Sequence, residues 1–404
     1  MVSLVRRYYL YRATLSAGFY LPVSVIYMET QGLGLADIGF VQGAFLFSMV
    51  ASELPTGYLG DRLGRRSALA LGNAIVVAVM LGFTVADSTA AFAVVYVVWA
   101  VGWTFRTGTA DAWLYELLAE EGMADEHARI SGRANSALRI VSAGTALTAG
   151  VLYTIDPAVP FLANAGLAAL GLPLLATLPK TQGSADGDAD ANAETDAADS
   201  GMSVREAVRV LATQLPRPSI RWIVAYAALF NLVFSVTRVF EQPAMRAVGV
   251  QVAELGLLYA GFKLVSAVAA GSVGPIQDRL GTRGVLLSLV PVVAVVYASF
   301  AVVPILLVPA LFVRRGMQSV TRPVRNEYIN DRLEDVGRAT VLSGVSMALT
   351  LVSGTANVLG GRVAASVGPL AFLSTVGVAV SVAGGLVWVA TRPVRTSSAD
   401  AVPS

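Results

Sequence analysis

The stretch Gly57-Tyr-Leu-Gly-Asp61-Arg62-Leu-Gly64-Arg65-Arg66 occurs a second time as Gly274-Pro-Ile-Gln-Asp278-Arg279-Leu-Gly281-Thr-Arg283. The two copies are 217 residues apart, and each lies between two long apolar segments. The register continues upstream without a gap, because residues 32–39 align with residues 249–256 at the same spacing. A repeat of this length indicates a duplicated unit rather than a chance motif. We therefore expect two related halves in tandem.

The composition indicates that the halves are embedded in a membrane. Apolar residues make up 55% of the 404-residue chain and charged residues only 14%, and the mean hydropathy is +0.66. A soluble domain carries roughly 25% charged residues. The absence of cysteine excludes disulfides, thiolate metal sites and cysteine nucleophiles. A net charge of +2 argues against binding to nucleic acid.

The apolar segments predict an all-α membrane protein with about twelve transmembrane helices in two pseudo-symmetric six-helix bundles. A bilayer core of about 30 Å requires about 20 mainly apolar residues per helix. The expected spans of the first bundle are 8–28, 35–57, 67–86, 90–112, 134–154 and 160–178. Those of the second bundle are 222–244, 251–273, 284–303, 305–327, 340–362 and 369–391. Pro304 and Pro309 predict a tight turn between the ninth and tenth spans.

These spans divide the chain into three parts. Residues 1–180 form the first bundle and residues 219–404 the second, and the segment 181–218 links them. The linker contains clustered aspartates without an apolar group, which is typical of a disordered segment. Its portion 203–211 has capping-box spacing and predicts a short amphipathic helix.

Arginines in the short loops predict the orientation. They gather on one side of the predicted membrane, whereas the opposite loops carry mainly acidic residues, with Arg246 as the main exception. By the positive-inside rule, both termini and the linker are expected in the cytoplasm of a multi-pass protein of the cell membrane.

The duplicated loop resembles the signature of the major facilitator superfamily. The lead-in Ser52-Glu-Leu-Pro-Thr-Gly57 and the stretch Arg106-Thr-Gly-Thr-Ala-Asp111-Ala-Trp-Leu-Tyr-Glu116 are also similar to bacterial and archaeal members. The resemblance covers nearly the whole chain and implies secondary active transport by rocking of the two halves. We expect a monomer that exports small organic molecules by proton coupling, without a cofactor or enzymatic activity.

The resemblance also implies a gate. Asp61 and Arg65 are expected to latch the two halves, with Asp111 as the partner of Arg65. We expect Gly57 and Gly64 to permit a tight turn between packed helices. The full set of expected gating residues comprises the signature positions of both loops and the acid of the span 90–112: Gly57, Asp61, Arg62, Gly64, Arg65, Arg66, Asp111, Gly274, Asp278, Arg279, Gly281 and Arg283.

Charged residues inside the predicted spans are candidates for substrate binding or proton coupling, because an ionisable group in lipid is costly without a role or a partner. The candidates are Glu53, Arg106, Lys263, Arg314, Arg322 and Glu327. Arg106 and Arg322 are each followed by an acid five residues later, about 140° around the helix, which predicts pairing with other helices. Glu241, near the outer end of its span, is expected to be solvated or part of a gate. His127, the single histidine, is expected at a solvated surface.

Two alternatives remain open at this point. The Gly-Pro-Gly-Gly signature of drug/proton antiporters is missing from the expected span 134–154, which reads Ser142-Ala-Gly144 there. This puts efflux antiport in doubt without favouring a proton-coupled uptake symporter. A non-transporting membrane sensor or scaffold on the same fold is the second alternative. A nucleotide-binding loop is also missing, which argues against an ATP-driven pump in this chain.

Overall fold

The computed structural model describes residues 2–179, 218–332 and 338–394, and over these ranges the chain is helical and contains no strand. The predicted acidic linker and its amphipathic helix lie outside the described residues. The first part contains α1 (Val2–Thr14), α2 (Ser24–Thr30), α3 (Leu35–Leu63), α4 (Arg65–Val85), α5 (Thr89–Glu120), η1 (Ala124–Glu126), α6 (His127–Ile155) and α7 (Val159–Ala176). The second contains α9 (Pro218–Ala247), α10 (Val252–Gly271), α11 (Val273–Leu287), α12 (Leu289–Val302), η3 (Pro304–Leu306), α13 (Leu307–Asn330), α14 (Arg338–Val367) and α15 (Pro369–Thr391).

The helices confirm an all-α membrane fold. Among the described residues, nine helices are long and apolar enough to cross a membrane, and α11 with α12, bent by 65°, gives a tenth. α13 is long enough but carries four arginines, which lowers its hydropathy. The predicted turn before it is present, because η3 begins at Pro304.

The predicted first span, 8–28, is interrupted instead of continuous. α1 ends at Thr14, and regular helix resumes only at Ser24. Pro22 lies in the non-helical stretch and cannot donate a backbone hydrogen bond. Gly18 also lies there, where a Cβ would collide with Thr145 and with the backbone of α6. The interruption therefore lets the chain approach α6 closely.

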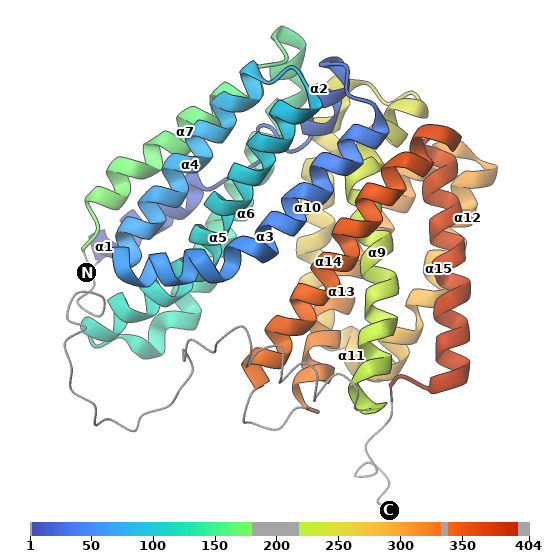
Figure 1. The fold of residues 1–404 in the computed structure, drawn as a ribbon. Helices are drawn as coiled ribbons and strands as arrows, with labels where there is room; N and C mark the ends of the chain where they lie inside the picture. The colour runs from blue at the N-terminus through green and yellow to red at the C-terminus, as the bar shows by residue number, and fades with distance from the viewer. Residues whose placement is uncertain (1, 180–217, 333–337, 395–404) are drawn as a thin grey trace, which may run out of the picture. The chain divides into compact units, whose positions relative to one another are not determined.

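Two compact units make up the chain. The first comprises Met1–Ala191 with Gly249–Lys263, and the second comprises Asn192–Val248 with Leu264–Ser404. In the first unit, α4 packs against α5 and α7, while α1 packs against α6 and α7 (Figure 1). In the second unit, α12 packs against α13 and α15, while α9 packs against α14 and α15. The same pairs of helices meet in both units, as expected for a duplication.

The repeat is also visible in the backbone. Gly32 and Gly249, 217 positions apart, have φ of 89° and 91°. Just after each of them, a backbone N–H donates to the acid three residues later: Gly34 to Asp37 at 3.1 Å and Gln251 to Glu254 at 2.8 Å. Equivalent positions thus start α3 and α10 with the same cap, which blocks fraying at the helix N-terminus.

The first signature is almost entirely helical, which corrects part of our prediction. α3 continues through Asp61 to Leu63, Gly64 alone breaks the helix with φ of 79°, and α4 begins at Arg65. The second signature lies within α11, which is kinked at Gly281 with φ of 64°. Gly64 and Gly281 therefore need glycine. Gly57 and Gly274 do not form the turn: both are helical, and a Cβ at either would meet nothing within 4 Å among the described residues.

Candidate functional site

A buried charge cluster lies in the second unit, between α9 and α13. Glu241 of α9 accepts hydrogen bonds from Arg314 at 2.7 Å and from Arg315 at 2.5 Å, one on each carboxylate oxygen. The side chains of Glu241 and Arg314 are each only 1% exposed, and that of Arg315 is 20% exposed. Arg314 also donates to the carbonyl of Phe234, at 3.4 Å. Two guanidinium groups thus surround one carboxylate in the core of the unit.

The surroundings of Glu241 correct our expectation that it is solvated. Its exposed fraction is 0%, and Arg314 and Arg315 of α13 bind its two carboxylate oxygens. Thr237 lies one turn before Glu241 on α9, and its hydroxyl forms a hydrogen bond of 2.6 Å with the hydroxyl of Tyr297. The repeat spacing places Ser24, Val97 and Val98 at the corresponding positions of the first unit, so this cluster has no charged counterpart there.

The corresponding region of the first unit is aromatic. Tyr20 and Trp99 have ring centroids 5.5 Å apart, and Trp99 also packs against Phe45 at 5.1 Å. Phe161 stacks on Phe83 at 4.8 Å. Edge-to-face and offset ring contacts of this kind add packing energy beyond the burial of area. The two units therefore share a backbone plan but differ in the chemistry of their cores.

Arg106 of α5 is a half-buried charge of the first unit. Its Nη2 donates to the carbonyl of Leu15, in the interruption between α1 and α2, at a long 3.4 Å. Its Nε is buried without a hydrogen-bond partner among the described residues. The titratable groups that act on it there are Tyr11, Tyr20 and Arg12, and none of these is a carboxylate. Arg106 thus differs from Arg314, whose charge is balanced by Glu241.

The arginines of the first signature bind within their own unit. Arg65 Nε donates to Glu116 Oε1 at 3.1 Å, so the carboxylate that it binds lies five residues beyond the expected Asp111. Asp111 instead accepts from Ser131 of α6 at 3.4 Å. Arg66 donates to the carbonyl of Leu178 at 2.7 Å, just after the end of α7. A cation at this place stabilises the unpaired carbonyls and the dipole of the helix C-terminus.

The second signature contacts α13 through the side-chain amide of Gln277. Gln277 Nε2 donates to Glu327 at 3.0 Å and to the hydroxyl of Thr282 at 3.3 Å. Glu327 is therefore linked to the signature of its own unit. The pattern of an acid five residues after an arginine recurs on α5 and α13, and in both helices the acid accepts a hydrogen bond from a neighbouring helix.

The remaining candidates lie in different places. Glu53 of α3 and Arg322 of α13 are exposed in the described structure. Lys263, in the part of α10 that belongs to the first unit, donates to Ser142 Oγ of α6 at 2.6 Å. Gly256 makes the same helix pair close, since a Cβ there would collide with the backbone of α6 at Ala146. Lys263 thus takes part in helix packing.

The sequence alone missed several residues of these clusters. The position of Glu241 near the end of its span predicts a solvated or gating residue, whereas the structure buries it. Arg315 is adjacent to Arg314 and is not among the candidates predicted for coupling, although both arginines bind the same carboxylate. Gln277 replaces a glycine of the first signature, Gly60, and that substitution was a signal that could have been used.

A model of the Major Facilitator Superfamily matches residues 13–241, which is more than half of the chain. An uncharacterised transporter of this type from Bacillus subtilis (strain 168) is 22% identical over 148 residues, covering 37% of this chain and 36% of that protein. One from Methanocaldococcus jannaschii is 29% identical over 124 residues, covering 30% of each. The chain thus matches about a third of the length of these curated relatives.

Solved structures with the same fold cover the whole chain. The nucleoside transporter NupG has a TM-score of 0.78 at 14% identity, over 97% of this chain and 98% of that one. A bacterial homologue of the human lysosomal transporter Spinster has a TM-score of 0.71 at 16% identity, over 98% of each. At these identities the likeness concerns the fold. Together with the family match, it shows that this chain belongs to the Major Facilitator Superfamily of membrane transporters.

Proposed function

We propose that this protein is a secondary active transporter that works by alternating access and exports small organic molecules in exchange for protons. It acts as a monomer in the cell membrane, with both termini in the cytoplasm. The two halves of the chain, 1–180 and 219–404, are the bodies that rock against each other, and the segment 181–218 connects them. Family membership supports transport as such, and the finer statements are ours.

The observation that carries the proposal is the pair of matched signatures. Gly64 and Gly281 break the helix at the same position of the repeat, with φ of 79° and 64°. The adjoining side chains hold neighbouring helices, through Arg65 with Glu116 in one unit and Gln277 with Glu327 in the other. A scaffold that never moves does not require the same tight turn, held to a neighbouring helix, in both units. Alternating access requires such a turn in each unit, because each unit must move as a rigid body.

Proton coupling is assigned to Glu53. It lies on the membrane-spanning part of α3, is exposed, and its carboxylate binds no cation among the described residues. A carboxylate can take up a proton on one side of a membrane and release it on the other. Glu241 is less suited to this exchange because both of its oxygens are engaged by arginines.

The test is flux in proteoliposomes that contain the purified protein. A panel of labelled amphipathic compounds is offered with a pH gradient of either sign, and internal pH is followed with a trapped dye. We expect at least one compound to move against its gradient while protons move the opposite way, and an uncoupler should abolish the accumulation. Movement of compound and proton in the same direction would identify an uptake symporter. A folded protein that moves no compound in this panel would support the scaffold instead.

A further inference from the structure

The first unit contains a concentration of unsatisfied donors where α1 meets α5. Four buried polar atoms on these two helices have no hydrogen-bond partner among the described residues: Tyr11 Oη, Arg12 Nε, Arg106 Nε and Trp113 Nε1. Native proteins pair nearly all of their buried polar atoms, so such a group needs an explanation. Each of these four atoms can donate a hydrogen bond.

Two of the four donors carry a positive charge. Arg12 and Arg106 are close enough to repel each other, and Tyr11 interacts electrostatically with both. Arg12 donates to the neutral amide oxygen of Asn135 at 2.5 Å, and Arg106 to the backbone oxygen of Leu15 at 3.4 Å. Neither acceptor carries a charge. Two neighbouring cations with neutral acceptors cost free energy inside a membrane protein, and an anion between them would relieve that cost.

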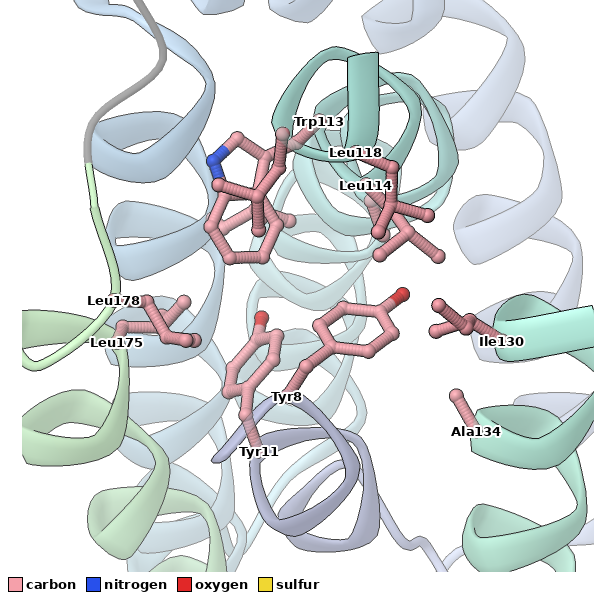
Figure 2. Packing of buried hydrophobic residues seen from close by; sticks show 12 residues of the cluster. Tyr8, Tyr11, Trp113, Leu114, Leu118, Ile130, Ala134, Leu175 and Leu178 are labelled. Carbon is pink, nitrogen blue, oxygen red and sulfur yellow. The ribbon is translucent and has the colours of Figure 1, made fainter. Parts of the chain in front are cut away.

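The interruption of the first helix supplies further donors. The backbone N–H groups of Ala17, Phe19 and Tyr20 donate to no acceptor in the described part of the chain. Tyr20 interacts electrostatically with Arg106, so the interrupted segment and the guanidinium group are neighbours. Figure 2 shows Tyr11 and Trp113 within the same packed cluster, with the Tyr11 hydroxyl directed to the side on which Trp113 lies.

We infer that Arg106 and Arg12, with the Tyr11 hydroxyl, form a subsite for an anionic group, so that the transported substrate carries a carboxylate or a phosphate. The inference rests on the proposed transport function and specifies its substrate class. A bidentate guanidinium contact to a carboxylate or phosphate is among the strongest polar contacts available to a protein.

The position of Arg106 favours a substrate over a lipid headgroup as the source of the anion. α5 spans Thr89–Glu120, and Arg106 lies 14 residues from its last residue. At 1.5 Å per residue this is about 21 Å along the helix. It lies 17 residues from the first residue, or about 26 Å. Arg106 is therefore near the middle of α5, and it lies six residues, about 9 Å, inside the nearer end of the expected span 90–112.

Ligand binding to the purified full-length protein in neutral detergent tests the inference independently of transport. Thermal unfolding is measured at constant ionic strength with three matched pairs of probes: benzoate and benzamide, phenylacetate and phenylacetamide, phenyl phosphate and phenol. We expect at least one anion to raise the unfolding midpoint more than its neutral partner. In Arg106→Gln its apparent affinity should fall about tenfold or more, and in Tyr11→Phe severalfold. Arg129→Gln, at an exposed arginine paired with Glu126, is the matched control and should bind like the wild type.

A second readout needs no ligand. Because Arg106 binds no carboxylate among the described residues, Arg106→Met should raise the unfolding midpoint of the ligand-free protein by about 2 °C or more, whereas loss of a structural ion pair would lower it. Equal effects of all anions and their neutral partners, or anion binding unchanged in Arg106→Gln, would overturn the inference. So would stabilisation that depends on Arg106 but is produced only by phosphatidylglycerol and not by the soluble anions. A positive binding result with no flux would leave the anion subsite standing and count against transport alone.

Discussion

Arg314 of α13 donates to Glu241 of α9 at 2.7 Å, and both side chains are only 1% exposed. The pair joins two helices in the core of the second unit. Arg315 occupies the second carboxylate oxygen, at 2.5 Å. Three charged groups therefore depend on one another in a place where none of them could be left alone at low cost.

Removal of Arg314 should destabilise the protein strongly. Arg314→Gln leaves Glu241 buried with only Arg315 as a charged partner, and breaking a buried pair costs about 3–5 kcal/mol. We expect a clear fall of the thermal unfolding midpoint in detergent. Arg246→Gln, at the exposed end of the same α9, should unfold at the wild-type midpoint.

The double variant Arg314→Gln with Glu241→Gln separates pairing from packing. Removing both charges should cost less than the sum of the two single losses, since the interaction between Arg314 and Glu241 can be lost only once. A wild-type midpoint in Arg314→Gln, or strictly additive losses in the double variant, would show that the cluster does not act as a coupled unit.

The glycines of each signature should fall into two classes. Gly64 and Gly281 have positive φ and ψ near 150°, a conformation that other residues adopt only at a cost of about 1–3 kcal/mol. Gly64→Ala and Gly281→Ala should therefore lower the unfolding midpoint. Gly57 and Gly274 lie in helices with open space for a Cβ among the described residues. Gly57→Ala and Gly274→Ala should therefore increase the free energy of unfolding by about 0.5–1 kcal/mol each and raise the midpoint. A common sign for all four variants would refute the assignment.

Asp61 should matter for cycling rather than for folding. Asp61→Asn removes the charge at the last turn of α3, on which the proposed latch depends, while preserving shape. We expect normal membrane insertion and a transport rate reduced about tenfold or more in proteoliposomes. His127→Ala should change little, because in the described part of the chain the His127 ring has a single ring contact, an edge contact with Tyr115 at 5.6 Å. Wild-type transport by the asparagine variant would remove the latch from the mechanism.

The sequence predicted the architecture well because lipid imposes a simple rule on helices. Spans, the duplication and the turn at Pro304 all follow from apolar length and repeat spacing. Pairing was harder to predict. Whether Arg65 binds Asp111 or Glu116 depends on how α4 and α5 cross, and the burial of Glu241 depends on which face of α9 meets α13. Such choices are made by tertiary packing, about which one sequence contains little information.

Arg65 and Glu116 provide a test of coupling between the first signature and α5. Their side chains are 17% and 27% exposed, so solvent screens the interaction and we expect a coupling energy of about 0.5–1 kcal/mol. The double-mutant cycle of Arg65→Gln and Glu116→Gln, followed by chemical denaturation, measures it. Additive single effects would mean that the contact contributes nothing to stability.

Glu53 should carry the coupling proton. Glu53→Gln cannot bind and release a proton, so accumulation driven by a pH gradient should be lost. Exchange of labelled for unlabelled substrate across the same membrane should continue, because it needs no net proton movement. Asp87→Asn, at an exposed acid between α4 and α5, removes one carboxylate outside the spans and should keep both activities. Loss of exchange together with accumulation in Glu53→Gln would point to a role in binding or folding, and retention of both would place the proton on another residue.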